Sequence, residues 1–181
     1  QLASEIKIKY GIAKIITANN VFAHVDNLVG ILDGLKLLMD DNTIFVFEVS
    51  YLLDVINEVL FDTIYHEHLS YHSVKPLDDF FKKHDMKLIN IKKVSSHGGS
   101  IRGIVQKVSG VKKTDNTVKQ FINDESNFGL YKVNTYKFFE KSIKKLKFDL
   151  MFILNNHKKN NKKIIGYGAP AKATTLMYYF G

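Results

Sequence analysis

Two short runs of apolar, β-branched residues, with a helical stretch between them, constrain the fold more than any other feature of this sequence. Residues 13–17 (AKIIT) and 43–49 (TIFVFEV) have the length and side-chain content of buried strands, and residues 28–39 repeat apolar side chains at helical spacing. A strand, a helix and a strand of these lengths form a right-handed βαβ unit with parallel strands. The chain therefore predicts an α/β fold with an open sheet.

Polar residues stand where both predicted strands end. Ala18, Asn19 and Asn20 follow the first strand, with His24 shortly after them, and Glu48 lies near the end of the second. Open α/β sheets bind ligands beyond the carboxyl ends of their parallel strands. We expect a ligand-binding edge here, although Glu48 would serve equally as a cap of the strand end.

The sheet is expected to continue with an antiparallel pair, residues 87–94 and 101–108, joined by turn-forming residues 95–100 (SSHGGS). A parallel sheet that ends in such a pair is similar to that of class I methyltransferases. Their cofactor glycine loop follows the first strand, and no such strand precedes residue 13, so the strands correspond to the later part of that sheet. Further helices are expected over residues 1–11, 51–60 and 76–84.

The pattern becomes helical and polar over residues 114–161, which we interpret as an amphipathic connector. Residues 162–172 then predict a strand, a glycine turn and the start of a helix, with Pro170 in its first turn. Backbone N–H groups there, together with Lys172, are suited to hold a phosphate. We therefore divide the chain into residues 1–112 and 113–181.

The densest group of functional side chains is Tyr65, His66, Glu67 and His68. An extended or loop backbone would direct Tyr65 and Glu67 to one side and the two histidines to the other. Burial and mutual contact can tune His and Glu toward neutral pH, which suits proton transfer. A solvent-facing polar loop is the alternative interpretation.

Composition narrows the classes of protein. The 181 residues contain 45% hydrophobic residues and no cysteine, so a core can form but neither disulfides nor thiolate metal sites can. No apolar run approaches the length of a membrane span and no signal peptide is visible, so we expect a cytoplasmic protein without membrane contact. The formal net charge of +8 comes from dispersed lysine pairs. A composition rich in Lys, Asn, Ile and Tyr is often only codon bias, and the functional alternative is attraction to an anionic substrate such as a nucleotide sugar, or to nucleic acid.

Five segments together resemble the S-adenosylmethionine-dependent C-methyltransferases, which methylate a carbon beside the ketone of a nucleotide-linked 4-keto-deoxy sugar. The Tyr-His-Glu-His and His-Gly-Gly-Ser blocks are the most specific parts, and small departures are Ala173 in place of Gly and His72 in place of an aromatic residue. The matching segments are ANNVFAHVDNLVGILDGLKLL (18–38), FVFEVSYLLD (45–54), FDTIYHEHLSYHS (61–73), HGGSIRG (97–103) and IGYGAPAKATTLMYYFG (165–181).

The resemblance implies S-adenosylmethionine as cofactor and a nucleotide-diphosphate sugar as partner. Residues 1–112 would be a partial methyltransferase core, and residues 113–181 a helical connector and the start of a C-terminal α/β domain. Members of the family also have a cysteine-built zinc domain and a cofactor glycine motif at the N-terminal side. We expect this chain to be an internal fragment, inactive alone, with zinc only in the missing domain.

The resemblance also implies roles for single residues. His68 is the expected base, Glu67 would orient it or bind a sugar hydroxyl, Tyr65 would donate to the enolate oxygen, and His24 is a second catalytic candidate, whereas His66 faces away. Asn20, with Ala18 and Asn19, would lie along the cofactor adenosine. The sugar nucleotide and its diphosphate would be held by His97, Gly98, Gly99, Ser100, Arg102, Tyr167, Gly168 and Lys172.

Two other functions remain open from the sequence. A metal-dependent hydrolase or lyase would use His24, His66, Glu67 and His68 as ligands, although their spacing is not the i, i+4 pair of zinc proteases, and we expect no metal. A basic nucleic-acid-binding module would use the lysines, but these form no recognition motif, and we expect no nucleic-acid partner. A partly folded fragment without function is a third alternative.

Overall fold

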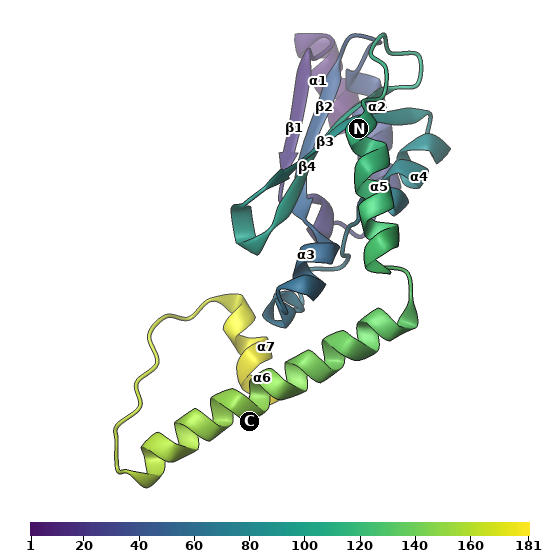
Figure 1. Ribbon diagram of the computed structural model, residues 1–181. Helices are drawn as coiled ribbons and strands as arrows, with labels where there is room; N and C mark the ends of the chain where they lie inside the picture. Colours follow the sequence, from purple (N-terminus) through teal and green to yellow (C-terminus); the bar gives the residue numbers. More distant parts are fainter.

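The computed structural model describes residues 1–181 and shows an α/β fold in which a four-stranded sheet is followed by a long helix that leads away from it (Figure 1). The strand order is β1-β2-β4-β3. β1 and β2 are parallel, and β4 is antiparallel to both β2 and β3. The predicted parallel strands with a terminal antiparallel pair are therefore confirmed. The strands are β1 (Ile15–Asn19), β2 (Ile44–Ser50), β3 (Met86–Val94) and β4 (Ser100–Lys107).

The helices of the first part of the chain agree with the predicted ones to within a few residues. Gly11 ends the first helix with φ 79, a backbone conformation that glycine adopts without strain. The helices are α1 (Leu2–Tyr10), α2 (Leu28–Leu38), α3 (Leu52–Asn57), α4 (Val74–Lys83), α5 (Asn116–Phe128), α6 (Val133–Lys159) and α7 (Ala171–Phe180). Short 3-10 turns are η1 (Phe22–His24), η2 (Phe61–Thr63) and η3 (Ser96–Gly98).

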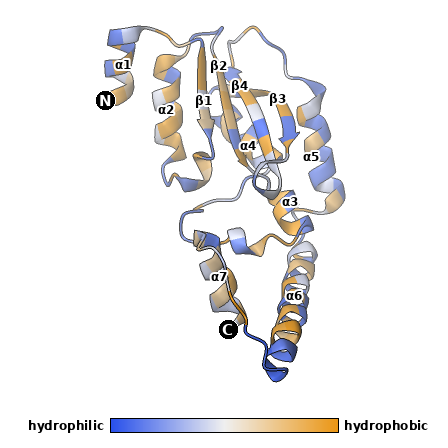
Figure 2. Ribbon diagram, turned by 90° about the vertical axis from the view of Figure 1, so that its left-hand side faces the viewer, coloured by the Kyte–Doolittle hydropathy of each residue, from blue (hydrophilic) through white to orange (hydrophobic).

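The core lies on one face of the sheet. Phe45, Phe47 and Val49 alternate along β2 and are buried against side chains of α2, α4 and α5. Phe22 of η1 stacks on both phenylalanines, at 5.7 Å between ring centroids. Because neighbouring residues of a strand point to opposite faces, Glu48 lies on the other face. Figure 2 shows β1 and β2 hydrophobic over most of their length, whereas α5 is largely hydrophilic.

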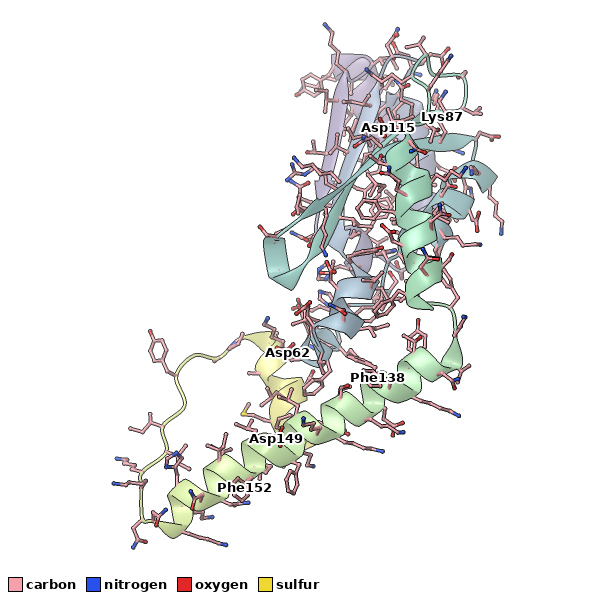
Figure 3. All side chains as sticks on the ribbon, viewed as in Figure 1. Asp62, Lys87, Asp115, Phe138, Asp149 and Phe152 are labelled. Carbon is pink, nitrogen blue, oxygen red and sulfur yellow. The ribbon has the colours of Figure 1, made fainter.

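The C-terminal helices lie away from the sheet. α6 has no buried residue, and α7 buries only Phe180. Figures 1 and 2 show α6 running away from the sheet and α7 returning beside the η2 region, while Figure 3 shows Phe138 and Phe152 on α6. No helix of the chain is both long and apolar enough to cross a membrane.

Two predictions for the second part of the chain are wrong. Residues 162–165 are not a strand but an exposed, irregular segment, because no other strand lies beside them to complete a ladder. The stretch over residues 114–161 is helical as expected and forms α5 and α6, and Gly129 ends α5 in the left-handed conformation with φ 78. Pro170 immediately precedes α7 and is not inside its first turn.

Candidate active site

A pocket of about 310 Å³ opens at the carboxyl end of the parallel strands. Asn20 follows β1, Ser50 ends β2, and His97 lies in the β3–β4 connection, so three neighbouring strands contribute to its wall. Its volume is in the range of small-molecule sites. The other lining residues are His24, Thr63, Tyr65, Glu67, His68, Pro170, Ala171 and Lys172.

A tight turn, not an extended backbone, presents the Tyr-His-Glu-His stretch. The His68 N–H donates to the Tyr65 carbonyl at 3.0 Å, which closes a β-turn. Tyr65, Glu67 and His68 therefore line the same pocket, and His66 is exposed and does not line it. The predicted alternation, with both histidines on one side, is wrong because the turn reverses the chain between Tyr65 and His68.

Backbone hydrogen bonds bring His24 to the turn. The Leu69 N–H donates to the Ala23 carbonyl at 2.7 Å, which attaches η1 to the residue after His68. The His24 and His68 rings consequently meet edge to face, with centroids 5.1 Å apart. Two histidines from segments distant in the sequence thus share one wall of the pocket.

The hydrogen bonds of His68 define which of its nitrogens is basic. Nδ1 lies 2.8 Å from the Thr63 carbonyl oxygen. A carbonyl only accepts, so we assign the proton of the neutral ring to Nδ1 and the lone pair to Nε2. Nε2 lies 3.5 Å from the Tyr65 hydroxyl, and the two ring centroids are 4.5 Å apart. A basic nitrogen and a phenol therefore meet at the pocket wall.

Tyr65 is held in its protonated form. Burial raises the pKa of Tyr65 above its ordinary value, and the neighbouring Glu67 carboxylate raises it further. At neutral pH the hydroxyl is therefore a hydrogen-bond donor. This donor is suited to an oxygen that gains negative charge during a reaction.

The start of α7 also lines the pocket. Pro170, Ala171 and Lys172 contribute to it, and the Lys172 ammonium lies 3.9 Å from the Asp62 carboxylate. The Thr175 hydroxyl donates to the Ile64 carbonyl at 2.8 Å. Figure 3 shows Asp62 at the junction between the η2 region and α7. A cation and a helix N-terminus thus line the same pocket as the two histidines.

Eight residues that the sequence suggested as ligand contacts do not line this pocket. The guanidinium of Arg102 pairs with the Glu48 carboxylate at 2.8 Å. Gly99 packs on Asp54, where an added Cβ would lie 2.3 Å from a carboxylate oxygen, and Tyr167 is exposed. The eight are Ala18, Asn19, Gly98, Gly99, Ser100, Arg102, Tyr167 and Gly168.

The sequence did not identify two of the lining residues. Ser50 ends β2, the strand beside β1, so the strand-end argument that identified Asn20 could have found it. Nothing in the sequence indicated Thr63, because its contribution to the site includes a backbone carbonyl. Pro170 and Ala171 line the pocket within the segment before Lys172 that was expected to hold a phosphate.

The metal-site alternative requires four side chains to converge. His66 is outside the pocket that holds His24, Glu67 and His68. The structure contains no group of three or more His, Cys, Asp or Glu side chains placed to hold a metal ion. The four side chains of this alternative therefore do not converge on one point in the structure.

Comparisons with known sequences point to one class of enzyme. Residues 95–181 match the sequence model of the C-methyltransferase C-terminal domain. C-methyltransferase NovU of Streptomyces niveus is 27% identical over 177 residues, which is 98% of this chain and 42% of that protein. These matches confirm the predicted resemblance: the chain is related to the C-methyltransferases. It spans less than half the length of this curated relative.

Two solved structures are similar in part. An S-adenosylmethionine-dependent methyltransferase from Anabaena variabilis ATCC 29413 has 12% identity and a TM-score of 0.42, over 58% of this chain and 53% of that one. LepI, in a complex with S-adenosylmethionine, has 10% identity and a TM-score of 0.39, over 53% of this chain and 26% of that one.

Proposed function

We propose that the protein transfers a methyl group from S-adenosylmethionine to a carbon beside the ketone of a nucleotide-linked 4-keto-deoxy sugar. His68 is the base that forms the enolate. The relation to C-methyltransferases supports carbon as the methyl acceptor. The single observation that carries the mechanism is the His68 geometry, with Nδ1–H on the Thr63 carbonyl and Nε2 beside the Tyr65 hydroxyl.

The chain's residues account for the first half of the reaction. Nε2 of His68 removes the proton from the carbon beside the ketone. The electrons of that C–H bond form the carbon–carbon double bond of the enolate, and the π electrons of the ketone move onto its oxygen. The Tyr65 hydroxyl donates to this oxygen as it becomes negative. His24, whose ring touches His68, is placed to pass the proton onward, and Glu67 is placed to bind a sugar hydroxyl.

S-adenosylmethionine, when bound, would supply an electrophilic methyl group for the enolate carbon. The residues at the end of β1 fit one side of such a ligand, because the Asn20 amide lines the pocket at the strand end where α/β sheets bind nucleosides. Asn20 has φ 53, a conformation that Asn adopts more readily than most residues. We propose that Asn20, with Ala18 and Asn19 before it, lies along the adenosine.

The charged wall of the pocket supports an anionic acceptor. Lys172 and the N-terminus of α7 line the pocket with the histidines, and both favour phosphate oxygens. A nucleotide-diphosphate sugar would place its ketone at His68 and its diphosphate toward α7. His97, at the mouth of the pocket, would contact the sugar or its nucleotide. In this proposal residues 1–112 are methyltransferase core and residues 113–181 connect to the acceptor-binding domain.

The proposal is tested by methyl transfer in the whole protein. We expect His68→Ala to lower kcat about a thousandfold, since a positioned base contributes roughly 10²–10⁴-fold. Tyr65→Phe should lower kcat by about a hundredfold through loss of one oxyanion donor. Both variants should bind S-adenosylmethionine as the unaltered protein does.

His66→Ala is the matched control, because His66 belongs to the same turn but does not line the pocket. It should keep methyl transfer within about twofold. If His66→Ala and His68→Ala lose activity equally, the turn has only a structural role and the proposed base is wrong.

A further inference from the structure

Glu48 is a buried carboxylate that the proposed mechanism does not use. Its side chain is 7% exposed, on the face of the sheet opposite Phe47. Arg102, its neighbour on β4, donates two hydrogen bonds to Oε2 from Nε and Nη2, at 3.1 and 2.8 Å. The Ser96 hydroxyl donates to Oε1 at 2.6 Å. These bonds, first that from Ser96 and then those from Arg102, hold the pKa of Glu48 below its ordinary value.

The contact with Ser96 fixes the loop that carries His97. The Ser96 carbonyl accepts from the Gly99 N–H and from the Ser100 hydroxyl, both at 3.0 Å, so Ser96 is the centre of the turn. His97, the next residue, has φ 53 and ψ 31. Such a conformation is unfavourable for a residue with a side chain and persists where surrounding contacts impose it. The Glu48–Ser96 bond is one of those contacts.

Glu48 also holds Asn20, a second residue of the pocket, by its backbone. The Asn20 N–H donates to the Glu48 carbonyl at 2.8 Å, and Asn20 also has a positive φ of 53. The Asn20 amide nitrogen lies 3.4 Å from Nε2 of His97. Glu48 therefore positions both of these neighbouring residues, His97 through its carboxylate and Asn20 through its main chain.

We infer that Glu48 is a positioning residue that holds His97 at the mouth of the pocket and thereby sets the affinity for the methyl acceptor. Arg102 completes this unit by orienting the Glu48 carboxylate and does not contact the acceptor. The alternative is that Glu48 and Arg102 are only a pair that stabilises the sheet. The kinetic part of the inference rests on the proposed function, whereas the conformational part does not.

The kinetic test uses Glu48→Gln and Ser96→Ala in the whole protein. Each should raise KM for the acceptor about tenfold while kcat stays within about threefold. KM for S-adenosylmethionine should stay unchanged, because Asn20 is held by the backbone of residue 48. In a His97→Ala background neither substitution should raise acceptor KM further. Equal rises in both backgrounds, or an acceptor KM within twofold of the unaltered protein, would overturn the inference.

The conformational test needs no reaction. Nuclear Overhauser contacts between the Asn20 amide and the His97 ring should be present in the unaltered protein and lost in Ser96→Ala. Glu140→Gln is the matched control, since Glu140 is an exposed carboxylate paired with Lys144 on α6, and it should keep these contacts. Contacts that survive in Ser96→Ala would contradict the inference even if the protein transfers no methyl group. An inactive unaltered protein with the expected contacts would refute only the proposed function.

If Glu48→Gln does not fold, Ser96→Ala is used for both the kinetic and the conformational test, and the same results are expected of it. The Ser96 side chain is only partly buried, so its truncation removes one hydrogen bond without opening the core. A thermal unfolding midpoint that matches the unaltered protein would show that the change in acceptor KM is local.

Discussion

The sheet region is held together by a buried apolar core, whereas the C-terminal helices are mostly exposed. The candidate active site lies where the two regions meet. The sheet region holds 17 residues in one continuous apolar cluster, whereas α6 buries none of its 27 residues. α7 touches the sheet region at η2, through Phe180, Thr175 and Lys172. The sheet region is therefore expected to fold as a unit, while α7 is held by a few contacts.

The two regions supply different residues to the pocket. The hydrogen bonds that hold His68 and His24 lie within the sheet region, and α7 adds contacts to Asp62 and Ile64 beside them. Lys172 belongs to α7 and reaches the pocket only while that helix is docked. The base is thus built into the rigid region, and the proposed phosphate contact is supplied by the weakly held region. Three substitutions test this difference between the two regions.

The largest effect is expected from Phe47→Ala. Phe47 is fully buried in the core, 5.7 Å from the Phe22 ring and 5.6 Å from the Phe81 ring. Its truncation should lower the free energy of unfolding by about 3–5 kcal/mol in urea titration. Phe152→Ala on α6, where the side chain is 66% exposed, should change it by less than about 0.5 kcal/mol. Equal losses would show that α6 is part of the same cooperative unit.

A smaller, local effect is expected from Phe180→Ala. The Phe180 ring is buried and stacks on Phe61 with centroids 5.4 Å apart, a contact of about 2 kcal/mol. Amide hydrogen exchange over residues 171–180 should accelerate tenfold or more, while exchange in β2 and β4 stays unchanged. The control is Tyr178→Ala, because that side chain is 87% exposed. Faster exchange in the strands as well would mean that α7 stabilises the whole sheet region.

The smallest effect is expected in the pH dependence of the free energy of unfolding, to which His72 contributes. Burial lowers the pKa of His72 below its ordinary value, which a backbone hydrogen bond to Phe22 only partly opposes. Because the folded-state pKa is lower than the unfolded one, stability is complete above about pH 6.5 and falls as the pH decreases, by at most about 1.4 kcal/mol per pH unit. His72→Phe should abolish the fall between pH 7 and 5, measured by urea titration. If the free energy of unfolding falls just as steeply with decreasing pH in His72→Phe, other groups are responsible for the fall.

The sequence predicted the sheet because its signals are local. The β-branched runs, the Gly11 stop and the turn formers around Gly98 and Gly99 each act within a few residues, and the strands lie where these signals place them. Residues 162–165 carry the same kind of signal, but a strand also needs a partner, which local sequence does not specify. The prediction therefore failed where pairing, not propensity, decides the structure.

The sequence predicted most of the residues that line the candidate site, but not how they are arranged. Strand-end reasoning, the glycine-turn segment and the resemblance together covered nine of the eleven lining residues, including His24, His68 and Lys172. The turn that gathers Tyr65 and His68 depends on one backbone hydrogen bond, and the proton on Nδ1 depends on the Thr63 carbonyl. Arg102 was expected to bind the acceptor, and its pairing with Glu48 depends on strand register, which the sequence did not reveal.

The most direct test of the proposed base is hydrogen exchange on the acceptor in the absence of S-adenosylmethionine. In deuterium oxide the unaltered whole protein should introduce deuterium at the carbon beside the ketone of a nucleotide-linked 4-keto-deoxy sugar, as should His66→Ala. His68→Ala should slow this exchange about a thousandfold. Exchange at the unaltered rate in His68→Ala would contradict the assignment of His68 as the residue that removes the proton.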